Sequence, residues 1–304
     1  MNLFLYLLVV GIWGTTWLAI AMQQGAVSVP VSIFWRFAVA AFCLWAILLI
    51  GRQLKQLQRA DHLFCLLQGC CVFGFNFYCF YTAAGLISSG LESVIFSMAV
   101  LFNTVNARLF FGQPLKANLI YASALGVGGI VALFWHDLQA TQLSGPMLAG
   151  VGLCLLGTFG FSLGNMISWR HQRRGLDTLS TNAWAMLYGT LIMGSIALLR
   201  GDSFMPELTL RYLGALGYLA IFGSVIGFGA YFKLVGRIGA SQAAYSTLLF
   251  PLVALTMSTL YEGYHWYPNA VLGLLMILAG NLVMFAWPAG GIRWPWRSLH
   301  AASR

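Results

Sequence analysis

Long apolar runs alternate with short polar connections along the chain. Each run holds close to the ~20 residues that an α-helix needs to cross the hydrocarbon core of a bilayer. Because the connections are short, we expect neighbouring helices to pack against one another. The pattern predicts ten spanning helices, at about residues 3–22, 31–50, 63–84, 90–111, 118–135, 146–168, 180–199, 211–234, 241–261 and 268–287.

Two stretches of the chain repeat the same order of features. Residues 85–134 and residues 236–287 each begin with small residues, then have an apolar run, a bend and a second apolar run containing glycine. Internal similarity of this kind predicts a duplicated membrane unit. Pro251 lies inside an apolar run, where it removes a backbone donor and predicts a helix break. Such a break is tolerated in a membrane where a neighbouring helix or water satisfies the freed carbonyl.

The composition excludes a soluble protein. Of the 304 residues, 60% are hydrophobic and 8% are charged, and no soluble domain of this size can cover so much apolar surface with polar groups. We therefore expect an all-α integral membrane fold. The first run has no Lys or Arg before it, which favours a retained spanning helix over a signal peptide. The six cysteines have no metal-ligand spacing and are interpreted as apolar filling, so no metal site is predicted.

The basic residues are segregated between the two sides that ten spans define. Arg200 and Arg211 fall on one side, and Arg36 lies within a span. Because loops rich in Lys and Arg stay in the cytoplasm, we expect a multi-pass protein of a bacterial inner membrane with both termini cytoplasmic. The net charge of +9 then reflects topology, and no nucleic-acid partner is expected. The other side holds Arg52, Lys55, Arg59, Arg108, Lys116, Arg170, Arg173, Arg174, Lys233, Arg237, Arg293, Arg297 and Arg304.

The ten runs divide into two units of five, at residues 2–135 and 147–287, followed by a cytoplasmic tail at 288–304. An odd number of crossings per unit inverts the second unit relative to the first. Inverted repeats in membrane proteins place a binding site near the midplane, between the halves. Two GxxxG pairs, Gly160 with Gly164 and Gly223 with Gly227, are predicted to let helices approach closely.

Four stretches carry a likeness to a known family: Gly11–Trp17; Phe75–Tyr78 with Tyr81–Ala84; Gly227–Tyr231 with Lys233–Ser241; and Pro251–Glu262 with Gly273 and Gly280. With these motifs and its span pattern, the chain resembles the drug/metabolite transporter superfamily, in particular its ten-helix EamA-type exporters with two EamA repeats. The resemblance implies secondary transport, usually export of amino acids or other small metabolites, without ATP. The chain has no GxxxxGK[ST] phosphate loop.

The chain departs from the family pattern at two places in its first half. Gly112-Gln113 stands where the family usually has Gly-Glu, and the Pro that typically interrupts the fourth helix is missing around Ala99. We therefore expect the first half to be less kinked than the second.

Three charged residues are candidates for transport chemistry. Arg36, near the outer end of the second helix, is expected either to pair with a substrate carboxylate or to snorkel outward or bridge Glu92 or Glu262. Glu92 begins the fourth helix, where a carboxylate suits the helix dipole; the alternative is proton coupling. Glu262 ends the ninth helix and is interpreted as a structural or capping residue rather than a proton carrier.

Polar and aromatic side chains at mid-depth form a second group of candidates. Lipid penalises the amides of Asn76 and Asn165, so both are expected to face protein or water. Asn103 and Asn106 share one helix face and either bond to another helix or line a path. The group either lines a route for an amphipathic solute or serves as interface anchors and helix links. The candidates for the path are Trp13, Trp17, Arg36, Asn76, Tyr78, Tyr81, Asn103, Asn165, Tyr231, Gln242 and Tyr245.

Enzyme chemistry finds little support in the sequence. The five histidines lie at helix ends or in loops, and no GxSxG elbow or pair of intramembrane carboxylates is present. We expect a protein that is not an enzyme and uses no cofactor, with a small-molecule substrate and the lipid bilayer as partners. The alternatives are a nucleotide-sugar or drug carrier, a channel, and a membrane-embedded lipid-modifying enzyme.

Overall fold

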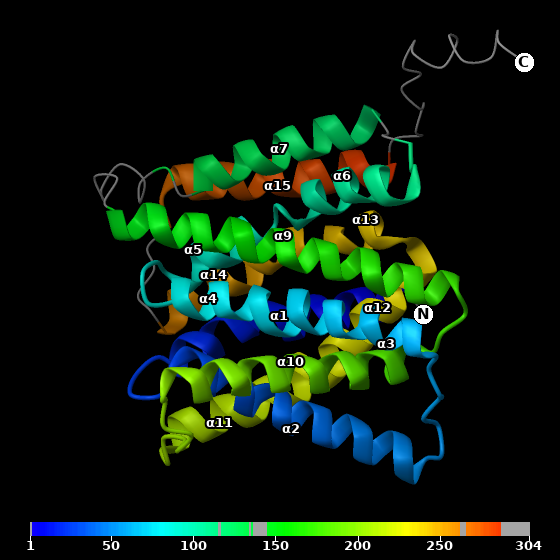
Figure 1. Ribbon diagram of the computed structural model, residues 1–304. Helices are drawn as coiled ribbons and strands as arrows, with labels where there is room; N and C mark the ends of the chain where they lie inside the picture. The colour runs from blue at the N-terminus through cyan, green and yellow to red at the C-terminus, as the bar shows by residue number, and fades with distance from the viewer. Residues whose placement is uncertain (1, 115–116, 134, 136–144, 262–265, 287–304) are drawn as a thin grey trace, which may run out of the picture.

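The computed structural model describes residues 2–114, 117–133, 135, 145–261 and 266–286, and every element within these ranges is a helix (Figure 1). Several helices are unbroken: α1 (Asn2–Met22), α2 (Val29–Ile50), α7 (Ala117–Leu133), α9 (Gly145–Arg173), α10 (Thr178–Arg200) and α15 (Pro268–Ala286). The others follow one another within longer helical segments: α3 (Arg59–Gln68), η1 (Gly69–Asn76) and α4 (Phe77–Ala83); α5 (Ser89–Phe96) and α6 (Ala99–Phe111); α11 (Leu210–Tyr218), η2 (Leu219–Ile226) and α12 (Gly227–Ile238); α13 (Ala240–Ala243), η3 (Ala244–Leu249) and α14 (Phe250–Tyr261).

Within the described ranges, eight helical segments are long and apolar enough to cross a bilayer, and Ile120–Leu133 and Pro268–Gly280 are shorter apolar helices. The structure is therefore that of an all-helical, multi-pass membrane protein. In Figure 1 the helices run roughly parallel and antiparallel, with α7 and α15 packed together at one side of the bundle and α2 with α10 at the opposite side.

Local sequence sets the helix ends. Asp177 caps α10, since its carboxylate accepts a hydrogen bond from the Ser180 backbone N–H at 2.8 Å. Gly201 ends the same helix with φ +72°, a conformation that glycine adopts without a steric penalty. The predicted sixth run stopped at residue 168, whereas α9 continues to Arg173. At this end Arg170, and Arg174 directly after the helix, contact the buried carboxylate of Asp61 on α3, at 3.4 and 2.7 Å.

Two segments contain a π-helix at matching positions. η1 lies between α3 and α4, and η2 lies between α11 and α12. In η2 the backbone N–H of Gly227 bonds to the carbonyl of Phe222 rather than to that of Gly223. This wider register frees the Gly223 carbonyl for a bond from another helix.

The break associated with Pro251 falls just before the proline. Pro251 is the second residue of α14, and the preceding turns, Ala244–Leu249, form the 3₁₀-helix η3. A helix lacking this proline would donate from residue 251 to the Thr247 carbonyl. Here the Thr247 carbonyl accepts from the Phe250 backbone N–H, in the pattern of a 3₁₀-helix, and also from the Ser97 hydroxyl of the neighbouring segment at 3.2 Å. The carbonyl is therefore satisfied both within its own helix and by a neighbouring one.

The fourth run is interrupted more briefly than the ninth, whose interruption includes the six residues of η3. Although it has no proline, α5 ends at Phe96 and α6 begins at Ala99. The hydroxyls of Ser93 and Ser97 donate to backbone carbonyls of Gly90 and Ser93, at 2.8 and 3.3 Å. Serine hydroxyls that bond back to the preceding turn bend helices, which accounts for the break.

Both predicted GxxxG pairs are confirmed as close helix contacts. A Cβ atom at Gly164 of α9 would collide with Val72 of η1, and one at Gly227 would collide with the Trp13 indole of α1. Gly160 and Gly223 line the same two contacts. Since side chains are excluded from these crossings, the helix backbones approach closely.

The contact between α9 and η1 yields a prediction for stability. Gly164→Ala places a methyl group against Val72, and such overpacking costs about 1–3 kcal/mol. Gly152→Ala, on the same helix, is the matched control, because a Cβ there meets nothing within 4 Å. We expect thermal unfolding of the purified protein in detergent to show a lower Tm for Gly164→Ala alone. Equal melting of the two variants would contradict the assigned contact.

Candidate functional site

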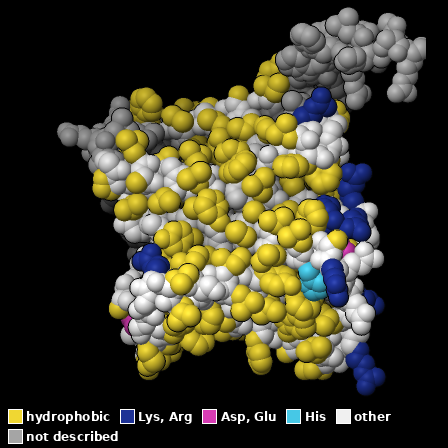
Figure 2. Space-filling view, in the orientation of Figure 1, with side chains coloured by type: hydrophobic (Ala, Val, Ile, Leu, Met, Phe, Trp, Pro, Cys, Tyr) yellow, Lys and Arg dark blue, Asp and Glu magenta, His cyan; other side chains and the backbone are white. Residues whose placement is uncertain are grey.

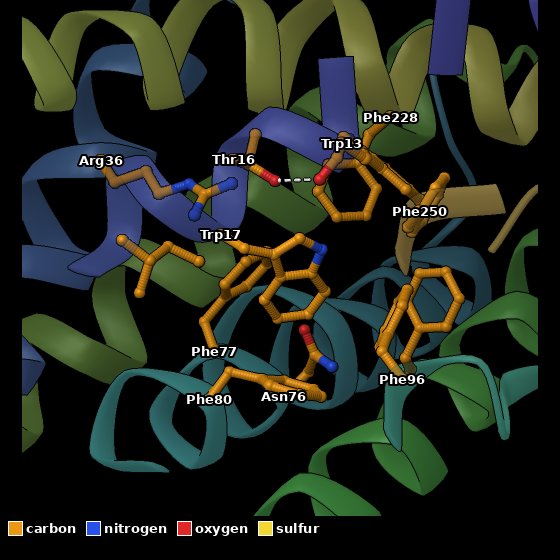
Figure 3. A pocket seen from close by; sticks show the side chains of 12 residues that line it. Trp13, Thr16, Trp17, Arg36, Asn76, Phe77, Phe80, Phe96, Phe228 and Phe250 are labelled. Carbon is orange, nitrogen blue, oxygen red and sulfur yellow. Dashed lines mark hydrogen bonds between the residues drawn. The ribbon is translucent and has the colours of Figure 1, made fainter. Parts of the chain in front are cut away.

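An aromatic cavity lies where helices from both halves of the chain converge. α1 contributes Trp13, Thr16, Trp17 and Ile20, and α2 contributes Arg36. The remaining walls are Asn76 of η1, Phe77 and Phe80 of α4, Phe96 of α5, Phe161 of α9, Phe228 of α12 and Phe250 of α14. Figure 3 shows the indole of Trp17 in the middle of this group, with Arg36 to one side and Phe96 and Phe250 on the other.

Arg36 is the only charged residue in this wall, and it is almost completely buried, with 1% of its surface exposed. Its Nε donates to the Ser224 hydroxyl of η2 at 3.0 Å, and its Nη1 donates to the Tyr81 hydroxyl of α4 at 3.5 Å. Its guanidinium carbon lies 4.2 Å from the ring centroid of Phe77, which adds a cation–π contact. The side chain is thus held in place by two other segments of the chain, η2 and α4.

The guanidinium of Arg36 retains capacity for an anion. Within the described part of the chain, no carboxylate lies within ion-pair distance of it, and its Nη2 makes no hydrogen bond. The snorkelling alternative is wrong because the side chain is buried among other helices, and bridging to Glu92 is wrong because no such pair forms. A pair with Glu262 lies outside the described residues.

Trp17 offers a second unused donor in the same cavity. Its indole Nε1 is buried and has no hydrogen-bond partner among the described residues. Phe80 and Phe96 hold the ring edge-on, at centroid distances of 5.0 and 5.4 Å. A buried polar group without a partner is uncommon in native proteins, and a bound ligand is one explanation for it.

Trp13 has a different role from Trp17. Its indole N–H donates to the Gly223 carbonyl of η2 at 2.9 Å, which is the carbonyl freed by the π-helical register. Asn76 likewise donates from Nδ2 to the Gly157 carbonyl of α9 at 2.8 Å. Both residues therefore line the cavity and also link two helices.

Hydrogen bonds join α4 to the residues that follow α1, beside Arg36 of the cavity wall. The Tyr81 hydroxyl donates to Gln23 Oε1 at 2.8 Å, and Gln24 Nε2 donates to the Tyr81 carbonyl at 3.2 Å. Tyr81 and Gln23 are both buried. Because the same hydroxyl accepts from Arg36, these contacts and the cation are directly connected.

A buried amide cluster lies on the other flank, next to Trp13. Asn165 Nδ2 of α9 donates to the side-chain Oδ1 of Asn103 on α6 at 3.2 Å and to the Tyr231 hydroxyl of α12 at 3.1 Å. The Tyr231 ring lies 4.9 Å from that of Trp13, centroid to centroid. Asn106 donates to the Ser162 hydroxyl at 2.9 Å, so both asparagines on the face of α6 bond across to α9.

Other candidates lie away from this cavity. Tyr78 is half-buried on α4, and Tyr245 is buried in η3, but neither lines the aromatic cavity. Gln242 lines a separate cavity of about 320 Å³ beside Trp169 and Arg237. Glu92 is fully buried in the first turn of α5, where the helix dipole favours its charge. Glu262 lies outside the described residues.

The volume of the aromatic cavity indicates whether the site is open or closed to a solute. It measures about 30 Å³, which is room for one or two water molecules and not for a metabolite. A solute can occupy it only after the surrounding helices move apart.

Sequence reasoning missed the six phenylalanines of the wall. In the sequence they look like ordinary lipid-facing or core residues, since phenylalanine is common in all apolar runs. A usable signal was the spacing of Asn76 and Phe80, four apart and hence on one helix face. Ser224 was missed because its importance depends on Arg36 of a distant helix.

Comparison with known proteins identifies related chains. The profile of the EamA-like transporter family matches residues 1–135 and 148–286. YoaV, an uncharacterized transporter of Bacillus subtilis (strain 168), is 24% identical over 276 residues, which are 88% of this chain and 91% of that protein. The "Probable amino-acid metabolite efflux pump" of Salmonella typhimurium (strain LT2) is 24% identical over 200 residues, 63% of this chain and 66% of that one.

A solved crystal structure shares the fold. It superposes with a TM-score of 0.73 over 94% of this chain and 96% of that chain, at 15% sequence identity.

The connection between Tyr81 and Arg36 leads to a prediction. Tyr81→Phe leaves Gln23 and Arg36 each without one buried hydrogen bond, which costs about 1–3 kcal/mol. Tyr78→Phe, one turn earlier on α4, removes a hydroxyl with no partner among the described residues and is the control. We expect thermal unfolding in detergent to show a lower Tm for Tyr81→Phe only. Loss of the same size in both variants would argue against the Tyr81 contacts.

Proposed function

Since the chain belongs to the EamA-like transporter family, and is therefore a membrane transporter rather than an enzyme, we propose that it is a secondary carrier exporting amino acids or similar small metabolites across a bacterial inner membrane. The central aromatic cavity is the proposed substrate site. The observation that carries this proposal is the buried guanidinium of Arg36, which faces the cavity with an unused nitrogen and no carboxylate partner in the described chain.

The proposed architecture is ten spans in two inverted units, residues 2–135 and 147–287. Contacts that α1 of the first unit makes with the second unit recur between α9 of the second unit and the first, which supports a pseudo-two-fold relation. α1 packs on α12 as α9 packs on α4, and α1 packs on α14 as α9 packs on α6. The π-helices η1 and η2 occupy corresponding positions. Sites in such proteins lie between the two units, and the walls of the aromatic cavity come from both.

The proposed orientation places both termini, and the tail at residues 288–304, in the cytoplasm. Figure 2 shows Lys and Arg side chains gathered at one end of the bundle, with a broad hydrophobic belt between the ends. Cytoplasmic loops carry such an excess of basic residues.

The proposed substrate carries a carboxylate and an apolar portion. Arg36 Nη2 and Trp17 Nε1 would donate to the carboxylate, while the phenylalanine faces would contact the apolar part. Hydrogen bonds to a charged partner in a dry site are stronger than neutral ones. The Salmonella relative's name refers to amino-acid metabolites, which fit this description.

The proposed mechanism is alternating access, in which one flank of the cavity opens at a time. The Tyr81–Gln23 contact would close one flank and the Asn165–Tyr231 contact the other. An arriving carboxylate would compete with the Tyr81 hydroxyl for Arg36, so that binding weakens the first closure. The proposed places where the helices change shape are the π-helical turns of η1, which lines the cavity through Asn76, and of η2, which directly precedes the helix of Phe228.

A nucleotide-sugar carrier is the second candidate. The guanidinium of Arg36 suits a phosphate as well as a carboxylate, although a nucleotide sugar requires a much larger opening of the cavity. A cationic drug fits less well, because Arg36 would repel it.

Substitution at Arg36 tests the substrate site. In liposomes holding purified protein, we expect Arg36→Gln to lower counterflow of zwitterionic amino acids by about 10- to 100-fold, the loss of a charge-assisted hydrogen bond. Trp17→Phe keeps the ring and removes only the N–H, and should lower counterflow by about 3- to 10-fold. Arg200→Gln, at an exposed helix end, is the control. Counterflow undiminished in a folded Arg36→Gln protein would show that Arg36 is scaffolding.

Labelling of single cysteines tests the orientation. In a background with the six native cysteines replaced, Gln58→Cys and Ser203→Cys place thiols at exposed positions near opposite ends of the bundle. An impermeant maleimide added to intact cells should label only Ser203→Cys, and permeabilised cells should label both. Labelling of both in intact cells would refute the proposed topology.

A further inference from the structure

A second, basic cavity lies at the end of the bundle where α2 turns into α3. It measures about 550 Å³ and is formed by the end of α2, the connection of residues 51–58, the start of α3 and the middle of α10. Arg52, Lys55 and His62 line it, and no Asp or Glu is among its described lining residues. In Figure 1 this connection lies at the same end of the bundle as the α9–α10 turn. The cavity is separate from the aromatic site and is unused by the transport mechanism.

The connection that forms this cavity is held in a fixed shape. Arg52 has φ +50°, and it is the one non-glycine residue in the described ranges with a positive φ. A side chain in this conformation costs about 1–2 kcal/mol, which glycine would avoid. The Lys55 backbone N–H donates to the Ser180 hydroxyl of α10 at 3.0 Å, which ties the connection to the bundle. A strained arginine at a cavity wall is consistent with a functional demand for its charge.

The floor of the cavity is aromatic. The rings of Trp184 and His62 meet edge to face at 4.5 Å, and Trp45 contacts Trp184 at 4.7 Å. His62 Nδ1 also lies 3.0 Å from the Tyr188 hydroxyl. Tryptophan and tyrosine in this arrangement are typical of the membrane–water interface, where lipid headgroups lie.

Apolar side chains flank the basic wall. Leu49 and Ile50 at the end of α2 and Leu63 on α3 are all more than half exposed, at 57%, 84% and 56%. A water-soluble anion would have no use for this apolar margin, whereas acyl chains would cover it. Positive charge, interface aromatics and exposed leucine and isoleucine side chains together fit the headgroup and acyl chains of a phospholipid.

We propose that this cavity binds the headgroup of an anionic phospholipid. The phosphate, with the negative charge of the headgroup, would lie against Arg52 and Lys55, and the acyl chains would run along Leu49, Ile50 and Leu63. Basic pockets between spanning helices bind anionic lipids in this way. The proposal depends on membrane insertion and not on the identity of the transported solute.

Native mass spectrometry of the full-length protein, released from detergent after incubation with phosphatidylglycerol or phosphatidylcholine, tests this site. We expect wild type to prefer phosphatidylglycerol by at least about tenfold. Arg52→Gln with Lys55→Gln should reduce the preference to about twofold or less. Arg108→Gln with Arg173→Gln removes two exposed charges from the same end of the bundle and outside the cavity, and should leave it unchanged.

A second variant distinguishes loss of the lipid site from misfolding of the protein. Arg52→Gly relieves the left-handed backbone, so its Tm should equal or exceed that of wild type while the lipid preference falls. A preference kept in both cavity variants, or lost equally in the Arg108/Arg173 control, would overturn the proposal. Displacement of the lipid by inorganic phosphate at equal concentration would also overturn it, in favour of a site for soluble anions.

Discussion

Inside a bilayer every polar group must find its partner within the protein, and this requirement governs the architecture described above. At two places where a helix departs from regular α geometry, a side chain from a neighbouring helix bonds to the backbone. The Trp13 indole donates to the Gly223 carbonyl in η2, and the Ser97 hydroxyl donates to the Thr247 carbonyl before Pro251. These irregular turns are therefore also places where helices are joined.

The same requirement makes the exceptions informative. Trp17 Nε1 is buried without a partner among the described residues, and Arg36 Nη2, in the wall of the same cavity, makes no hydrogen bond to them. A site whose walls are phenylalanine offers no internal competitor for these donors. Under the proposed function, the carboxylate of the solute would supply the acceptor that these donors lack, so an anion could bind without breaking an existing ion pair.

The basic residues at the two cavities have different surroundings and different proposed roles. One arginine is buried at mid-depth and held by Ser224, Tyr81 and Phe77, so its position is accurately fixed. The arginine and lysine of the α2–α3 connection remain near the surface, where charge serves contact with the lipid interface. If positive charges are only counted, all of these basic residues are explained by membrane topology. The burial of its side chain distinguishes Arg36 from the others.

Apolar runs, the segregation of Lys and Arg, and family motifs such as Gly11–Trp17 were sufficient for the membrane class, the all-helical fold and the transporter assignment, because bilayer thickness and loop charge act on local sequence. Pro251 likewise predicted the break in its helix. The cavity walls, the serine-induced break near Ser97 and the partners of Arg36 were decided only by the tertiary structure. Each depends on which face of one helix meets which face of another. Because hydrophobicity is nearly uniform around these helices, the sequence pattern does not identify that face, and side-chain packing decides it.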